Sequence, residues 1–356
     1  MQYLIESQLI LEYTLHRTCV GGNKGIQKDL DDGIDTIGKK MTVCQLYAKQ
    51  IRHRGNVRYN TKNGRKRLMK LLEEDKLGGC PIDSVKLSDA KEWAIRMKEK
   101  GISYKTISND KRSLKAAFYT AIQDDCIRKN PFDFQLNTVI EDDTEPKVPL
   151  TPAQEESFLS FAQNDKVYQK YYDELIILLG TGLRISELCG LTDTDIDFEN
   201  RIINVDHQLL RSAETGYYIE TPKTKSGIRQ IPMSEKVYEA FNRVLKRSRG
   251  AKAVTIDGYS NFLFLNRDGY PKTATNYDGM FRGLAKKYNK YHEEALPKVM
   301  TPHTLRHTFC TNMANAGMNP KALQYIMGHS NITMTLNYYA HATFDSAKAE
   351  MLRIAA

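Results

Sequence analysis

The chain has 356 residues, of which 41% are hydrophobic and 27% charged, proportions that are ordinary for a globular protein of two or three domains. No run approaches the roughly 18 apolar residues that a membrane span needs, and the N-terminus lacks the features of a signal peptide. The six scattered cysteines include no CxxC pair, which indicates reduced thiols in a cytoplasmic protein and argues against a zinc site or a disulfide framework.

The net charge of +9 is concentrated in one segment of the chain. Residues 41–135 contain 21 lysines and arginines against 11 aspartates and glutamates, so this segment carries +10 and the remainder is nearly neutral. A basic domain attached to a neutral one favours a polyanionic partner, with DNA or RNA the leading candidates. The alternative is a lysine-rich helical surface that is merely solvated, and charge alone does not decide between the two.

Glycines interrupt residues 1–40, where we expect a short helix followed by a flexible connection. Residues 41–135 predict a helical domain. Ser88 is expected to cap a helix that ends at Gly101, and Ser103 precedes a second, longer helix. The polar faces of the helices are rich in Lys and Arg, with Ser, Thr and Asn between them. That mixture suits contacts with phosphates.

The second half of the chain predicts a domain of mixed α and β structure. Residues 136–150 are acidic and contain prolines, which indicates a linker before it, and residues 344–356 predict a short amphipathic tail helix after it. The elements expected between them are a helix capped by Thr151, two helices joined by a glycine turn over 173–191, strands over 201–210, 216–223, 226–233 and 262–266, and a helix over 273–291.

Two segments of this domain could carry phosphate chemistry. Arg184 follows the glycine turn, and its planar guanidinium suits a phosphate edge because it donates two parallel hydrogen bonds and keeps its charge. The competing interpretation is a structural ion pair with Glu187. Lys223 and Lys225 lie in a predicted hairpin turn, where an ammonium group is either solvated or able to protonate a leaving oxygen.

The stretch 301–341 holds further candidates. His303 and Arg306 share one face of a helix near its N-terminus, where free backbone N–H groups and the helix dipole favour an anion. His329 follows a glycine at a turn. His307 and His341 are more simply explained as structural histidines, so we do not include them in the predicted site.

Tyr338 and Tyr339 are adjacent candidates for a nucleophile. A phenol has a reference pKa of about 10, so it needs positively charged neighbours and an acceptor for its proton before it can attack. Tyrosines in helices more often serve packing. Each residue alone is therefore weak evidence of catalysis, whereas the order of the whole set along the chain is specific.

That order, TGLRISEL, PKTKSGIRQIP, HTLRH, MGHS and then a tyrosine, closely resembles the tyrosine recombinases, or phage-type integrases. The LNYYAH ending is most similar to integrases of conjugative transposons. The resemblance implies a multidomain protein in which an all-α core-binding (SAM-like) domain precedes a mixed α+β catalytic domain, and the two form a C-shaped clamp on DNA. The implied bounds are 41–135 for the first domain, 136–150 for a linker, 151–343 for the catalytic domain and 344–356 for a tail helix that docks on a neighbouring protomer.

The resemblance also assigns roles to single residues. The residues implied to be catalytic are Arg184, Lys223, His303, Arg306, His329 and Tyr339. Lys223 is favoured by the spacing of the residues that follow it, and Lys225 is the alternative. Tyr338 fits the shorter family spacing from His329, and the Ala-His pair after Tyr339 favours Tyr339. Many relatives begin with an arm-binding domain, which residues 1–40 are too short to contain, so we expect that domain to be shortened or absent.

The implied reaction is site-specific recombination that integrates and excises a mobile element. Tyr339 attacks the scissile phosphate to form a 3′-phosphotyrosyl link, and Lys223 protonates the departing 5′ oxygen, without a metal, ATP or another cofactor. The implied partners are double-stranded DNA at attachment sites, a homo-tetramer of this chain, and accessory proteins that bend DNA or promote excision, with no membrane partner. The competing functions are a type IB topoisomerase, a protelomerase, a non-catalytic DNA-binding regulator and a metal-dependent nuclease.

Overall fold

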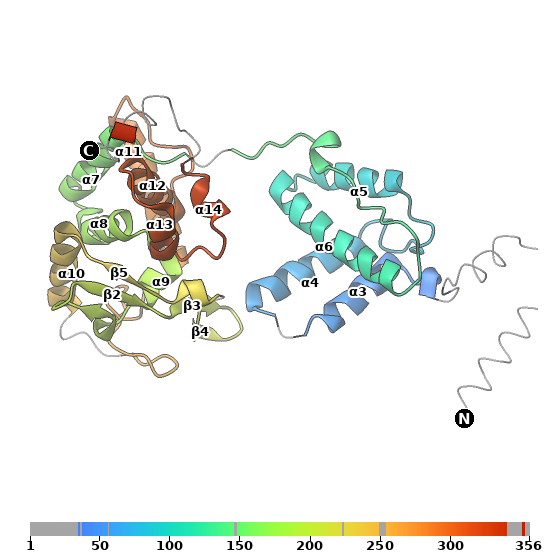
Figure 1. The fold of residues 1–356 in the computed structure, drawn as a ribbon, viewed down its shortest axis with the longest axis horizontal. Helices are drawn as coiled ribbons and strands as arrows, with labels where there is room; N and C mark the ends of the chain where they lie inside the picture. The colour runs from blue at the N-terminus through green and yellow to red at the C-terminus, as the bar shows by residue number, and fades with distance from the viewer. Residues whose placement is uncertain are drawn as a thin grey trace, which may run out of the picture. The chain divides into compact units, whose positions relative to one another are not determined.

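The computed structural model describes residues 35, 38–55, 57–145, 148–222, 224–248, 254–339 and 351–352, and the chain divides into two compact units, 1–145 and 146–356 (Figure 1). Lys223, His341, most of the N-terminal segment and most of the tail lie outside the described residues. Among the described helices, none combines the length and the apolar character that crossing a membrane would require.

Every regular element in the described part of the first unit is a helix. Its core includes a cluster of aromatic rings: Trp93 is fully buried, and its ring meets Phe132 edge-on with centroids 5.8 Å apart, while Phe118 packs against Phe132 at 5.3 Å. The helices are η1 (Gly38–Lys40), α3 (Val43–His53), α4 (Tyr59–Glu73), α5 (Leu87–Glu99), α6 (Tyr104–Gln123) and η2 (Leu136–Thr138).

The helix ends of this unit confirm one of the two predicted signals, Gly101, and show a further cap at Ser103. The Ser103 hydroxyl caps α6 by accepting a backbone N–H three residues on, at 3.4 Å, and Gly101 follows the end of α5 with a left-handed φ of +78°. The prediction for Ser88 was wrong, because α5 begins one residue before it. The Asp89 carboxylate instead accepts the N–H of Lys86 at 2.8 Å, and a charged acceptor at a helix N-terminus is favoured by the dipole.

The second unit combines helices with two small antiparallel sheets. Its helices are α7 (Pro152–Asn164), η3 (Gln169–Tyr171), α8 (Tyr172–Thr181), α9 (Ile185–Gly190), η4 (Asp193–Asp195), η5 (Lys225–Gly227), α10 (Glu235–Ser248), α11 (Ala274–Tyr291), α12 (Pro302–Asn315), α13 (Pro320–Met327) and α14 (Thr333–Leu336). One sheet has the order β1-β2-β5, from β1 (Ile196–Asp197), β2 (Ile202–Val205) and β5 (Arg229–Pro232), and the other pairs β3 (Gln208–Ser212) with β4 (Gly216–Glu220).

The predicted strand over 201–210 is divided between the two sheets. The chain leaves β2 after Val205 and enters β3 at Gln208, and His207 between them is buried with its Nε2 2.8 Å from the carbonyl oxygen of Gly190. Because β4 and β5 belong to different sheets, they do not form a hairpin. Lys225 lies in η5, within residues 221–228 between these strands, and Lys223 falls outside the described residues.

The predicted strand over 262–266 is wrong. Phe262 and Leu265 form only isolated bridges, to Thr192 and Pro271. The partner of Phe262 immediately precedes the 3-10 turn η4, so the pairing has no second residue with which to continue. The apolar run is nevertheless buried, and this burial explains why its sequence resembles a strand.

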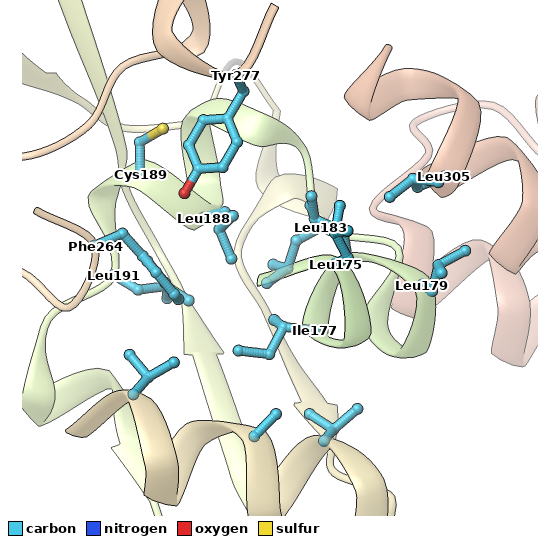
Figure 2. Close-up of a cluster of buried hydrophobic side chains, with 14 of the residues drawn as sticks. Leu175, Ile177, Leu179, Leu183, Leu188, Cys189, Leu191, Phe264, Tyr277 and Leu305 are labelled. Atoms are coloured by element: carbon cyan, nitrogen blue, oxygen red, sulfur yellow. The ribbon is translucent and has the colours of Figure 1, made fainter. Parts of the chain in front are cut away.

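The core of the second unit is built around α8, which contacts both α10 and α12 (Figure 1). Figure 2 shows Leu175 and Ile177 of α8 among side chains from other elements, including Leu305 of α12 and Tyr277 of α11. Burying a Leu or Ile side chain contributes about 1.5–3 kcal/mol. The end of α8 is therefore held firmly, and the next turn carries Arg184.

Candidate active site

The turn between α8 and α9 is fixed by one glycine. Gly182 has a φ of +63°, and a Cβ at this position would lie 2.5 Å from the ring of Phe309. The turn directs the Gly182 carbonyl oxygen toward α12, where Arg306 donates a hydrogen bond to it at 2.5 Å. Arg184 follows as the residue that caps α9. The predicted helix, glycine turn and helix are thus confirmed.

Arg306 is buried at the centre of the site. Only 3% of the residue is exposed, and its guanidinium also donates to the carbonyl oxygen of Met327 at the end of α13. Burial lowers the pKa of Arg306 to about 9, and the nearby charges of Arg184 and Arg229 act in the same direction. The Arg306 guanidinium therefore lies where burial and the neighbouring positive charges both oppose its own charge.

One buried carboxylate, that of Glu187, serves two arginines. Its Oε1 accepts from Arg184 Nη1 at 2.7 Å and from Arg229 Nη1 at 3.1 Å, and its Oε2 accepts from Arg229 Nη2 at 2.9 Å. Burial opposes the ionisation of Glu187, but the hydrogen bonds from Arg229 and the surrounding guanidinium charges outweigh it and hold the pKa below its usual range. The pairing of Arg184 with Glu187 is therefore real.

That pairing does not neutralise the cluster. Arg184 and Arg229 share the carboxylate of Glu187, whereas Arg306 bonds only backbone carbonyl oxygens, so among these four described residues three positive charges face one negative charge. Arg184 is the most accessible of the three, with 37% of its side chain exposed, and its Nη2 donates to the carbonyl oxygen of Gly328 at 3.0 Å. Desolvated cations in excess of their counter-ions form a site that is stabilised by an anion.

His329 enters the same cluster from the end of α13. Gly328 before it has a φ of +60°, and a Cβ there would lie 3.1 Å from the Arg229 guanidinium. The His329 ring is buried, with Nδ1 3.0 Å from the hydroxyl of Thr335. Burial lowers the pKa of His329 to about 4, and the guanidinium charges, led by that of Arg306, add to this effect. Its imidazole is therefore neutral at neutral pH.

His303 lies on the first turn of α12, which begins after Thr301 with Pro302 as its first residue. The residue is exposed, and it is near enough to His329 for its charge to lower the pKa of that ring. The structure thus brings together Arg184, His303, Arg306 and His329, which come from positions more than 140 residues apart in the chain.

The two tyrosines have different partners. The Tyr338 hydroxyl lies 2.8 Å from Nδ1 of His307, and the two ring centroids are 4.8 Å apart. Burial raises the pKa of Tyr338 to about 12, and the positive charge of Arg306 opposes that rise. The Tyr339 hydroxyl donates instead to the backbone carbonyl oxygen of Met318.

The predicted lysines are the least defined members of the site. Lys223 lies outside the described residues. Lys225 is exposed at the start of η5, and two residues later the Gly227 carbonyl oxygen accepts from Arg229 Nη1 at 3.0 Å. The connection that carries both lysines is therefore attached to the same arginine that binds Glu187.

Arg229 is the main residue that the sequence interpretation missed. Its side chain is fully buried, and besides Glu187 it binds the carbonyl oxygens of Gly227 and Ile326, the latter through Nε at 2.6 Å. A signal was present, because residues alternate between buried and exposed along β5 and Arg229 occupies an inward position with Ile231. An arginine at an inward strand position requires a buried anionic partner.

Residues 149–346 match the phage integrase family. The chain belongs to the phage integrase family. It is 69% identical over 329 residues to the transposase from transposon Tn916 of Enterococcus faecalis, an alignment that covers 92% of this chain and 81% of that protein. Among phage integrase family relatives of lower identity, tyrosine recombinase XerC of Bacillus subtilis is 27% identical over 265 residues, or 74% of this chain and 78% of that one.

Solved structures agree with the family assignment. The integrase of transposon Tn1549, in complex with a circular intermediate DNA, is 78% identical and superimposes with a TM-score of 0.85 over 88% of this chain and 99% of that one. A lambda integrase dimer bound to a core site shares only 15% identity, with a TM-score of 0.60 over 92% of this chain and 84% of that one, and so supports the fold alone. The fold is thus that of a tyrosine recombinase with mixed helices and sheets.

Proposed function

We propose that this chain is a site-specific DNA recombinase that cuts and rejoins double-stranded DNA through a covalent tyrosine intermediate, and so integrates and excises a mobile element. The observation that carries the proposal is the cluster of Arg184, Arg229 and Arg306, in which one carboxylate, that of Glu187, pairs with two of the three arginines and a phenol lies nearby. Two Tn1549 integrase structures, solved on a circular intermediate DNA and on transposon right end DNA, are 78% identical to this chain and support the same chemistry.

In this proposal the scissile phosphate supplies the missing anion. Arg184 is the accessible guanidinium and contacts the non-bridging oxygens, together with His303 at the start of α12. Arg306 stabilises the same charge from its buried position, where electrostatic interactions are stronger than in water. His329 takes part as a neutral hydrogen-bonding group, because its depressed pKa keeps it uncharged before DNA binds.

We infer that Tyr338, rather than Tyr339, is the nucleophile. Two Tn1549 integrase structures carry single substitutions, an arginine replaced by lysine and a tyrosine replaced by phenylalanine, at positions 154 residues apart. Arg184 and Tyr338 are also 154 residues apart, whereas Tyr339 is one residue further. In addition, the charge of Arg306 acts on the pKa of Tyr338, and the Tyr339 hydroxyl is engaged with a backbone carbonyl. Tyr339, which the Ala-His pair favours, remains the alternative.

The bond exchange then uses two side chains. The Tyr338 oxygen attacks phosphorus, the bond from phosphorus to the 5′ oxygen breaks, and a lysine of the 221–228 connection, Lys223 or Lys225, protonates the departing oxygen. The 3′-phosphotyrosyl link conserves the energy of the diester bond. Rejoining by a 5′ hydroxyl therefore needs no ATP, and the guanidiniums supply the charge stabilisation for which other enzymes use a metal.

We further propose that the helical first unit is the core-binding domain and closes with the catalytic unit as a C-shaped clamp on the duplex. The +10 charge of residues 41–135 supports this, because neutralising phosphates provides affinity that does not depend on sequence. Strand exchange between two duplexes requires four protomers, and docking of residues 344–356 on a neighbour would join them. Accessory proteins that bend the attachment sites fit the same scheme.

The test is covalent trapping on a nicked duplex that carries a candidate element end, performed in EDTA. We expect a protein–DNA adduct that survives SDS and carries the label of the fragment whose 3′ end lies at the break. Hydrolysed ends without an adduct, or cleavage lost in EDTA, would support a metal-dependent nuclease. Binding without cleavage would support a regulatory DNA-binding protein. Relaxation of supercoiled plasmid without strand exchange would favour a type IB topoisomerase.

A further inference from the structure

The contact between His307 and Tyr338 lies at the reactive atom of the proposed nucleophile. His307 follows Arg306 on α12, and its Nδ1 is 2.8 Å from the phenol oxygen, with the two rings inclined at 59°. His307 is the side-chain base within hydrogen-bond distance of this hydroxyl among the described residues. The sequence alone favoured a structural role, because the partner of His307 is 31 residues away and cannot be identified from local pattern.

The phenol requires such a partner. With a pKa of about 12, only on the order of one Tyr338 side chain in 10⁴ to 10⁵ is ionised at neutral pH. Arg306 favours the phenolate but does not accept a proton, since its guanidinium is already protonated. The neighbouring Tyr339 hydroxyl meets a backbone carbonyl oxygen, which accepts a hydrogen bond but cannot take up the proton.

We propose that His307 is the general base that holds the Tyr338 hydroxyl and takes its proton as the oxygen attacks the scissile phosphate. The inference rests on the proposed function and on Tyr338 as nucleophile. With its own proton on Nε2, His307 accepts the phenol proton on Nδ1 as the bond from oxygen to phosphorus forms. The bond to the 5′ oxygen breaks, and that oxygen takes its proton from the lysine. In rejoining, His307 returns its proton to Tyr338.

The two proposed proton transfers, from Tyr338 and to the 5′ oxygen, use residues from different parts of the fold. His307 lies on α12 beside the nucleophile, whereas Lys223 and Lys225 belong to the connection between β4 and β5. A variant that lacks the base should therefore still form the adduct slowly when the leaving group no longer needs a proton. A defect in the lysine should disappear under the same condition. A substrate with a 5′-bridging sulfur distinguishes the two, because a thiolate leaves without protonation.

The experiment measures the rate of adduct formation on the nicked duplex for His307→Gln and His307→Ala. Glutamine retains a hydrogen bond to Tyr338 but cannot accept a proton, so we expect both variants to bind DNA and to cleave about 10²–10⁴ times more slowly than wild type. The 5′-phosphorothiolate should not restore the rate, and added imidazole should partly restore it for His307→Ala. His292→Ala is the matched control, because His292 also contacts a tyrosine ring, that of Tyr288, with centroids 3.8 Å apart, and the variant should cleave normally.

A wild-type rate in His307→Gln would overturn the inference, as would full rescue of either variant by the 5′-phosphorothiolate. Failure of the proposed function is a different result. In that case wild type would form no adduct, whereas an adduct from Tyr338→Phe would show only that Tyr338 is not the nucleophile. If His307→Ala does not fold, the rate of His307→Gln on the two substrates decides the question.

Discussion

At the scale of single residues, Glu187 sets the charge balance of the site. It is the one carboxylate bonded to Arg184 and Arg229, and removing the charge of one partner of a buried pair leaves the other uncompensated. We therefore expect Glu187→Gln to lower the free energy of unfolding by about 3–5 kcal/mol in urea titration. Glu156→Gln, on the exposed face of α7, should change it by less than about 0.5 kcal/mol. A loss below about 1 kcal/mol for Glu187→Gln would show that the carboxylate is not the counter-ion described here.

His329 makes stability depend on pH in a defined direction. The unfolded chain binds a proton at His329 near its ordinary pKa of 6.5, whereas the folded chain binds it only near 4. Stability is thus fully present above 6.5 and declines as the pH falls toward 4, by about 2 kcal/mol between pH 7 and pH 5. Over the same pH interval, the free energy of unfolding of His329→Gln should therefore fall by about 2 kcal/mol less than that of wild type. Equal losses in urea titrations at the two pH values would contradict the assignment.

At the scale of elements, the helices with strong local signals were predictable. Thr151 and Thr301 precede prolines at the first helical position, and Gly182 and Gly328 end helices in the left-handed region, all of which can be read from neighbouring residues. Strand pairing was not predictable to the same degree. Because β4 and β5 find their partners in different sheets, the hairpin expected around Lys223 does not exist.

The site was predictable for a different reason. Arg184, His303, Arg306 and His329 were selected by the order of short motifs that resemble a known family, and the structure brings them together. Buried partners such as Arg229 and Glu187 form a network between β5 and α9 that no local periodicity specifies. The contact of His307 with Tyr338 is likewise a product of tertiary packing.

The turn between α8 and α9 offers a test of how tightly the site is held. Gly182→Ala introduces both an unfavourable φ and a Cβ 2.5 Å from Phe309, so we expect it to lower the free energy of unfolding by about 2–4 kcal/mol. Gly216→Ala is the matched control: its φ is +71° and no atom lies within 4 Å of the added Cβ, so only about 1 kcal/mol should be lost. Similar losses from both variants in urea titration would mean that the Phe309 ring moves away from the added Cβ at no further cost in stability.

The proposed general acid is Lys223 or Lys225, between β4 and β5 in the sequence. On an ordinary nicked duplex, either Lys223→Ala or Lys225→Ala should slow adduct formation by about 10²–10⁴, and that variant should recover on the 5′-phosphorothiolate substrate. Lys236→Ala, at an exposed position of α10, is the control and should behave as wild type. If neither variant is slowed, or if the slow one is not rescued, the acid lies outside residues 221–228.

At the scale of the whole molecule, positive charge is expected to serve different purposes in the two units. Residues 41–135 carry nearly all of the excess positive charge, which suits binding to a duplex without reading its sequence. The second unit has 26 lysines and arginines against 22 aspartates and glutamates, and it places positive charge in the arginine cluster, where it can act on a single phosphate. Affinity and catalysis are thus expected to respond to different substitutions.

The measurement that tests the central claim most directly is covalent trapping with the two tyrosine variants. Tyr338→Phe should bind the nicked duplex with unchanged affinity and form no SDS-resistant adduct, because it lacks only the attacking oxygen. Tyr339→Phe should still form the adduct, at a rate within about tenfold of wild type, since its hydroxyl contacts the Met318 carbonyl oxygen and not the arginine cluster. An adduct from Tyr338→Phe but none from Tyr339→Phe would transfer the role to Tyr339, and adducts from both would contradict a tyrosine nucleophile at this position.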